Sequence, residues 1–227
     1  MAYYLIHTCM KRIWYVQSYL VPSMIEQGIP KDHIRVYLDK NRIGNLRAFI
    51  DSCNRLNYWC DTYDINGVWH LQDDVIICKN FAEKTELLDD AGLVCGFTCD
   101  YEEKPQPGTF LLSEEKMWFS FPCIRIPTSI LKEFTNWANL NLWQSNYFRE
   151  SVRRNNADDL VFREWLYDNY GNTTHLNVAP NLVNHIDDLL DGSVVSPHRT
   201  ANTRSLFWED DDLVGHLKCE LDKRKNI

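Results

Sequence analysis

Residues 67–81, GVWHLQDDVIICKNF, decide the fold and the chemistry that we expect of this chain. Apolar residues lie on both sides of two adjacent aspartates, Asp73 and Asp74. Two neighbouring carboxylates in a core-like segment repel each other and resist losing water, unless a cation lies between them. Mg²⁺ and Mn²⁺ prefer oxygen ligands and are commonly held by one or two carboxylates together with substrate phosphates. The pattern therefore predicts a strand with a metal–diphosphate site at its carboxyl end. The alternative is a tight turn with solvated aspartates, because Asp is common in turns.

The composition predicts one soluble domain. The chain has 227 residues, 44% of them hydrophobic, and a formal net charge of −8, so no general basic field attracts nucleic acid or anionic membranes. We find no apolar run of roughly 18 residues and no signal-peptide pattern, which predicts a cytoplasmic protein without a transmembrane helix. The eight cysteines form no CxxC pair, and we expect buried free thiols rather than a zinc site.

The first third of the chain alternates between strand and helix patterns. Strands are expected at 3–7 and 34–38 and from Gly67 up to the acids at 72–74, and helices at 14–27 and 45–56. This alternation predicts an α/β fold with a mostly parallel central sheet flanked by helices.

The rest of the chain is less regular but continues the same domain. We expect strands at 93–98, 118–126 and 176–178, a connecting loop at 101–115, and helices at 128–137 and 158–170. We interpret residues 1–90 as a nucleotide-sugar-binding half, 91–190 as an acceptor-binding half and 191–227 as an irregular C-terminal tail.

Polar residues follow the first three predicted strands. They are His7 and Thr8, then Asp39, then Gln72 with Asp73 and Asp74. Because open α/β sheets bind ligands at the carboxyl ends of their strands, one cleft could hold a nucleotide whose diphosphate meets a metal at Asp74. Arg47, early in the next helix, could reach the pyrophosphate, although an ordinary surface arginine is an equal alternative.

These residues resemble the nucleotide-sugar half of GT-A-type glycosyltransferases, which carry a DxD-like motif. Asp39, Gly44-Asn45, Arg47 and then Gln72-Asp73-Asp74 occur in the corresponding order. The resemblance extends over residues 3–198 as a pattern of short motifs. It implies a single GT-A-like domain that uses Mn²⁺ or Mg²⁺ and a nucleoside-diphosphate sugar, commonly a uridine one, in a hexosyltransferase-like reaction.

Two later segments fit the same resemblance. Asp158 and Asp159 begin a predicted helix and look like the acceptor-side acidic motif, which implies that Asp159, or else Asp158, is the general base. Helix capping is the alternative for Asp159. The segment 180–185, PNLVNH, looks like the one whose histidine completes the metal shell, which implies that His185 is a ligand beside Asp74.

The chain departs from the family pattern at position 72, and further polar residues lie near the C-terminal end of the pattern. Position 72 is Gln where the family has an acid, so metal ligation is expected at Asp74, with Asp73 facing ribose or sugar hydroxyls. Asp187, Asp188 and Asp191 are competing ligands, and a solvated acidic loop explains them equally well. His198 and Arg199 could clamp the diphosphate.

A local basic cluster bears on the acceptor. Arg149, Arg153 and Arg154 precede the acceptor motif, where they could bind a phosphate-bearing acceptor such as a nucleic acid, a surface glycan or a lipid-linked sugar. A solvated helix face explains the same pattern and is the preferred interpretation.

Two other function classes remain open. A nucleotidyltransferase also uses paired carboxylates at a strand end, but it would want a Gly-rich loop after the first strand, and residues 7–12 contain no glycine. A nucleotide- or glycan-binding module without catalysis would keep the aromatic cleft and tolerate the loss of Asp159.

Overall fold

Short apolar strands build a seven-stranded sheet at the centre of the protein. The computed structural model describes residues 2–41, 43–97, 110–113, 121–153, 158–171, 175–178, 181–186 and 189–190. In chain order the strands of this sheet are β1 (Tyr3–Cys9), β2 (Ile34–Asp39), β3 (Gly67–Gln72), β5 (Val94–Cys95), β6 (Phe110–Ser113), β7 (Cys123–Pro127) and β8 (His175–Val178). Their spatial order is β2-β1-β3-β7-β5-β8-β6.

The sheet is mixed but mostly parallel. Strand β1 is parallel to both β2 and β3, and β5 is parallel to β8. Strand β7 is antiparallel to its neighbours β3 and β5, and β6 is antiparallel to β8. Five strands therefore run in one direction and two in the other, which confirms the predicted α/β fold class.

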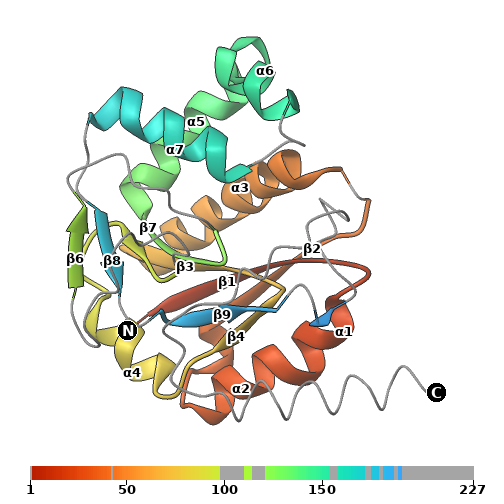
Figure 1. Ribbon diagram of the computed structural model, residues 1–227, viewed down its shortest axis with the longest axis vertical. Helices are drawn as coiled ribbons and strands as arrows, with labels where there is room; N and C mark the ends of the chain where they lie inside the picture. The colour runs from red at the N-terminus through yellow and green to blue at the C-terminus, as the bar shows by residue number, and fades with distance from the viewer. Residues whose placement is uncertain are drawn as a thin grey trace.

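Helices cover both faces of the sheet (Figure 1). On one face lie α1 (Ile13–Tyr15), a π-helical turn (Val16–Leu20), α2 (Val21–Glu26) and α4 (Phe81–Leu87). On the other lie α3 (Asn45–Tyr63), α5 (Thr128–Asn141), α6 (Asn146–Arg153) and α7 (Asp158–Tyr170). Short 3-10 helices occur at Lys31–His33 and Leu142–Gln144.

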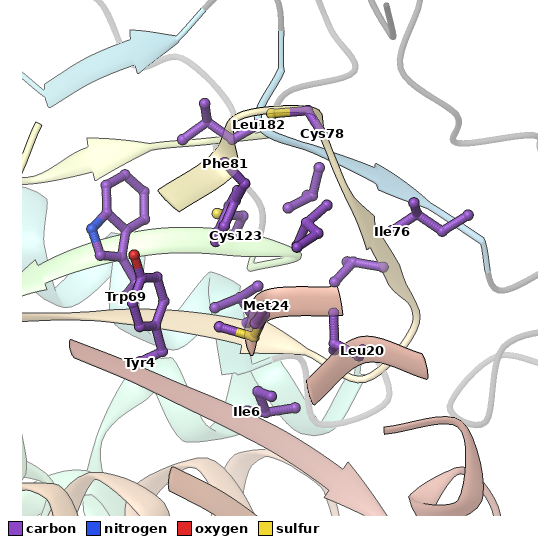
Figure 2. Close-up of a cluster of buried hydrophobic side chains, with 14 of the residues drawn as sticks. Tyr4, Ile6, Leu20, Met24, Trp69, Ile76, Cys78, Phe81, Cys123 and Leu182 are labelled. Carbon is purple, nitrogen blue, oxygen red and sulfur yellow. The ribbon is translucent and has the colours of Figure 1, made fainter. Parts of the chain in front are cut away.

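Alternating side chains of the strands supply two separate cores, because successive residues of a strand point to opposite faces. Tyr4 and Ile6 of β1 pack toward α2 and α4, and Figure 2 shows them near Met24 and Phe81. Leu5, between them in the sequence, packs with the core under α3, α5 and α7. Burial on both faces explains why β3 is apolar almost throughout, as expected for a central strand.

The chain bends at Asp73 and Asp74, directly after the third strand, whose carboxyl end the sequence prediction placed at these acids. Strand β3 ends at Gln72, and Val75–Ile77 forms β4, which pairs antiparallel with β9 (Val183–His185) in a separate two-stranded sheet. Figure 1 shows this small sheet on the side of α1 and α2. The bend places the two aspartates between the two sheets.

The middle of the chain departs from the sequence prediction in three places. The expected loop 101–115 contains β6, which pairs with β8. Of the strand expected at 118–126, residues 118–120 lie outside the described residues, and β7 begins at Cys123. Helix α4 was not predicted. The tail 191–227 lies outside the described residues.

Candidate functional site

Asp73 and Asp74 lie in the bend between β3 and β4, and both are buried, with 7% of their surface exposed. The alternative of solvated aspartates in a turn is therefore wrong. A turn is present, but it lies inside the protein, where two carboxylates need positive charge or hydrogen-bond donors.

The positive charge between these carboxylates comes from Arg12. Its Nη1 donates to Asp73 Oδ1 at 2.9 Å and also to Asp74 Oδ2. Arg12 is 4% exposed, and it lies in the connection between β1 and α1, at the carboxyl end of the first strand. Arg12 is not among the predicted site residues. A single basic residue soon after a strand carries no motif, so only its position in the fold identifies it.

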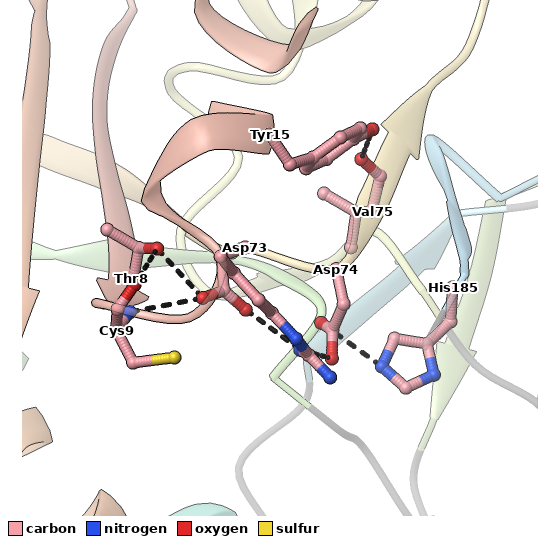
Figure 3. A network of polar contacts seen from close by, with 8 residues as sticks. Thr8, Cys9, Tyr15, Asp73, Asp74, Val75 and His185 are labelled. Carbon is pink, nitrogen blue, oxygen red and sulfur yellow. Dashed lines mark hydrogen bonds and ion pairs between the residues drawn. The ribbon is translucent and has the colours of Figure 1, made fainter. Parts of the chain in front are cut away.

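The end of β1 holds Asp73 from the other side. Thr8 Oγ1 donates to Asp73 Oδ2 at 2.8 Å, and the backbone N–H of Cys9 donates to the same oxygen at 3.2 Å (Figure 3). Thr8 thus orients a carboxylate, whereas the sequence predicted contact with the nucleotide. Protein donors engage both oxygens of Asp73, the residue that we expected to face sugar hydroxyls.

His185 reaches Asp74 through the pairing of β4 with β9. Val75 lies opposite His185 in this pair, and the backbone N–H of Ile186 donates to the carbonyl of Asp74 at 2.8 Å. Tyr15 fixes the start of β4 by donating its hydroxyl to the carbonyl of Val75 at 2.8 Å. As a result, His185 Nε2 lies 3.2 Å from Asp74 Oδ1 (Figure 3). The structure therefore brings the two predicted metal ligands together.

The donor atoms suit a divalent cation. Two ligand atoms bound at right angles to one ion, each at about 2.1 Å, are separated by about 3 Å. Asp74 Oδ1 and His185 Nε2 meet this condition. Within the described ranges, no group of three or more His, Cys, Asp and Glu side chains is arranged to hold a metal. Asp187, Asp188 and Asp191 lie outside these ranges.

Burial and charge act against each other at the two acids. Burial would raise the pKa of Asp74, but the charges of His185 and Arg12 lower it below its ordinary value. For Asp73, burial and the charge of Asp74 raise the pKa, while Arg12 and Thr8 act in the opposite direction. Asp74 is therefore the carboxylate held ionised, as a metal ligand must be, and His185 would have to lose its charge before it could bind the same ion.

The other predicted nucleotide-binding residues line the same edge of the sheet. Asp39 lies opposite Cys9, and Gln72 lies opposite His7, in the strand pairs that β1 makes. Asp39 is 8% exposed and accepts a hydrogen bond from the N–H of Ile43 at 3.3 Å. Burial lowers the pKa of His7 to about 4, against the charges of Asp39 and Asp74, so His7 is neutral at pH 7.

Asp158 and Asp159 begin α7, as predicted, but their environments differ. Asp158 is buried, with 4% of its surface exposed, while Asp159 is partly exposed. Asp158 Oδ1 accepts the N–H of Asp159 at 3.1 Å, and Asp159 Oδ1 accepts the N–H of Leu160 at 2.9 Å. Burial, followed by the charge of Asp159 and a smaller contribution from Asp74, raises the pKa of Asp158 to about 7. Asp158 therefore has the pKa that suits a general base near neutral pH.

Arg47 makes a contact that the sequence did not predict. Its guanidinium lies over the ring of Trp143, 4.8 Å from the centroid. Both residues line an open pocket of about 450 Å³, together with Ile50, Asp51 and Asn54 of α3. The predicted contact between Arg47 and a pyrophosphate thus competes with a cation–π contact.

The remaining predicted contacts are only partly described. Arg149 is exposed on α6, and Arg153 is the last residue of that helix. Arg154, His198 and Arg199 lie outside the described residues. Among the described cysteines, Cys9 is partly buried and the others are buried, all as free thiols. No helix in the described part of the chain is long and apolar enough to cross a membrane.

The chain was compared with known proteins and with solved structures. No protein-family model matches the chain, and no curated protein matches it. Among solved structures, the chain is similar to one titled "Crystal Structure of A197 from STIV", with a TM-score of 0.45 and 10% sequence identity. The match covers 81% of this chain and 85% of that chain.

Proposed function

We propose that this protein is a metal-dependent glycosyltransferase that moves a sugar from a nucleoside-diphosphate sugar, most simply a UDP-sugar, to an acceptor hydroxyl. The observation that carries the proposal is the 3.2 Å approach of His185 Nε2 to Asp74 Oδ1 at the edge where β3 ends. The sequence resemblance assigned these two residues as ligands of one ion, although they are far apart along the chain. The backbone pairing of β4 with β9 supports that assignment.

Asp74 and His185 would hold Mn²⁺ or Mg²⁺, with diphosphate oxygens and water as further ligands. When bound, the ion supplies Lewis-acid neutralisation of the charge that develops on the departing diphosphate. The guanidinium of Arg12, which contacts both aspartates, adds a second positive charge at the same place. Thr8 and the Cys9 amide keep Asp73 in position, and Asp73 in turn orients Arg12.

We assign the proton transfer to Asp158. The acceptor oxygen forms a bond to the anomeric carbon, the bond from that carbon to the diphosphate oxygen breaks, and its electron pair leaves with the diphosphate. The proton of the acceptor hydroxyl passes to a carboxylate. Asp158, with its pKa raised to about 7, holds this proton more readily at neutral pH than an ordinary aspartate. This differs from the sequence interpretation, which ranked Asp159 first.

For the acceptor we propose only a chemical class, a hydroxyl compound that carries phosphate. The exposed Arg149 on α6 precedes the start of α7, so a phosphate-bearing acceptor could bind beside Arg149. Modified nucleic acid, phosphate-containing surface glycans and lipid-linked sugars would each supply such a phosphate. Substituting Arg149 with Ala should weaken such an acceptor and leave the affinity for UDP unchanged.

A binding module without catalysis is the second candidate, and one observation favours it. Arg12 offsets one of the two carboxylate charges, and its guanidinium could contact the phosphates of a bound nucleotide. The two candidates differ in their need for a divalent ion.

Hydrolysis of UDP-sugars in the presence of Mn²⁺ tests the proposal. The wild type should release UDP, and both chelation and Asp74→Asn should abolish the release. Asp90→Asn, which removes an exposed carboxylate after α4, is the matched control and should behave as wild type. Release that survives chelation and Asp74→Asn would eliminate the metal mechanism. UDP binding without release by the wild type would favour the binding module.

A further inference from the structure

Arg12 shares the buried position of the two acids that it contacts. The exposed fraction of its side chain is 5%, and that of each aspartate side chain is 10%. A buried ion pair persists only where its geometry is good and its other polar atoms have partners. Here one guanidinium nitrogen donates to an oxygen of each acid, so Arg12 is the charge that allows Asp73 and Asp74 to be neighbours.

This arrangement determines what remains for a metal ion. Arg12 engages one oxygen of each carboxylate, and Thr8 and Cys9 engage the second oxygen of Asp73. Asp74 Oδ1 is the carboxylate oxygen that Arg12, Thr8 and Cys9 do not engage; its partner is His185 Nε2, at 3.2 Å, and a bound ion would lie between these two atoms. Any divalent ion bound there shares the Asp74 carboxylate with a guanidinium, and the two cations repel each other.

We propose that Arg12 is an internal counter-ion that competes with a divalent cation for the Asp73–Asp74 pair. The bare ion then binds weakly, and it binds tightly only together with the phosphates of a nucleoside diphosphate, whose negative charge attracts both the ion and Arg12. The identity of the phosphate ligand rests on the proposed function, whereas the competition between Arg12 and the ion does not. Because coupling between two ligands is reciprocal, UDP should strengthen Mn²⁺ binding by the same factor as Mn²⁺ strengthens UDP binding.

Direct binding of Mn²⁺ tests this inference without any turnover. Free Mn²⁺ is measured by electron paramagnetic resonance, with and without UDP, for wild type, Arg12→Gln and Arg12→Lys. Arg12→Gln should bind Mn²⁺ alone about tenfold more tightly than wild type, a coupling of ordinary size. Its enhancement by UDP should shrink. Arg12→Lys keeps the charge and should stay close to wild type.

Lys11→Gln is the matched control, because it removes one positive charge from the adjacent, exposed position. It should leave Mn²⁺ affinity unchanged. Equal Mn²⁺ affinity in wild type and Arg12→Gln would overturn the inference, as would an equal gain in Lys11→Gln.

If Arg12→Gln folds poorly, thermal unfolding with and without Mn²⁺ provides a second test. Without Arg12, two buried carboxylates face each other, so Arg12→Gln should have a lower Tm than wild type. Mn²⁺ should then raise its Tm by more than it raises that of wild type, since ligands stabilise the state that binds them. A smaller rise would overturn the inference. If Arg12→Gln gains Mn²⁺ affinity while wild type releases no UDP from any UDP-sugar, the proposed function fails and the competition stands.

Discussion

His185 Nε2 lies 3.2 Å from Asp74 Oδ1, and backbone pairing rather than sequence proximity produces this contact. Val75 and His185 are partners in the antiparallel pair of β4 and β9, and the N–H of Ile186 donates to the carbonyl of Asp74. The small second sheet therefore sets the geometry of the proposed metal site. Its strands lie against the core of α1, α2 and α4, because Ile77 and Val183 are buried there.

The proposed general base can be identified by comparing two neighbouring carboxylates. Asp158→Asn should slow sugar transfer by roughly 10²-fold or more, the usual size of such a contribution, and leave Mn²⁺–UDP affinity unchanged. Asp159→Asn should have a smaller effect, because Asp159 is partly exposed and lies outside the buried environment that raises the pKa of Asp158. Turnover numbers and UDP titrations for both variants check this. The reverse ranking would restore Asp159 as the base.

The same residue predicts a pH dependence of stability. Burial raises the pKa of Asp158 from 3.8 to about 7, so the folded state holds a proton that the unfolded state has lost between these values. This stabilisation is complete below about pH 4 and is lost as the pH rises through about 7. Asp158→Asn should therefore be more stable than wild type at pH 8, with a smaller difference at pH 4. Urea unfolding at the two pH values measures the difference in stability between the variant and the wild type. A difference that does not change with pH would contradict the raised pKa of Asp158.

Burial of His70 should make the stability of the protein depend on pH in the opposite direction. It is 1% exposed, among the rings of His7, Phe49 and Phe121, and burial lowers its pKa to about 3. The unfolded state takes up a proton near pH 6.5 and the folded state does not, so stability is lost as the pH falls from about 6.5 toward 3. His70→Phe should make the acid limb of the stability curve shallower. Urea midpoints from pH 7 to pH 4 test this, and an unchanged slope would show that other groups control it.

Arg47 and Trp143 make a prediction that separates a structural role from a ligand contact. If the cation–π contact is the role of Arg47, Arg47→Ala should lower stability by about 0.5–1 kcal/mol and leave UDP affinity unchanged. Trp143→Ala should remove the same interaction, so the effects of the two substitutions should not add. A double-mutant cycle in urea and a UDP titration give both readouts. A loss of UDP affinity in Arg47→Ala alone would support the pyrophosphate contact that the sequence suggested.

Gly67 starts β3 because a side chain there would collide with a buried arginine. A Cβ at Gly67 would lie 2.5 Å from Nη2 of Arg125, whose Nη1 donates to the carbonyl of Gly92 at 2.7 Å. Gly67→Ala should therefore destabilise the protein by roughly 1–3 kcal/mol through overpacking. Gly28→Ala is the comparison, since open space surrounds it and only its φ of +93° opposes a side chain. Equal losses in the two variants would argue against the collision.

Regular elements with strong local patterns could be predicted from the sequence. The helix expected at 158–170 is α7, and the strands and helices of the first third were placed within a few residues of their ends, except α3, which continues to Tyr63. Their apolar spacing reflects a core on one face of each helix, and on both faces of β1 and β3, so local sequence carries the information. Strand β6 and the pairing of β4 with β9 were not predicted, because pairing partners far along the chain define them.

At the site, local sequence indicates the residue types: adjacent acids at the end of an apolar strand, paired acids opening a helix, and a histidine after a short apolar run. Which of these residues meet depends on the fold. The fold places His185 beside Asp74 and Arg12 between the two acids. It also brings Thr8 and Cys9 within hydrogen-bond distance of Asp73, and it buries Asp158 more deeply than Asp159. The physical reason is that electrostatic partners are chosen by distance and burial in space, and a one-dimensional pattern records neither.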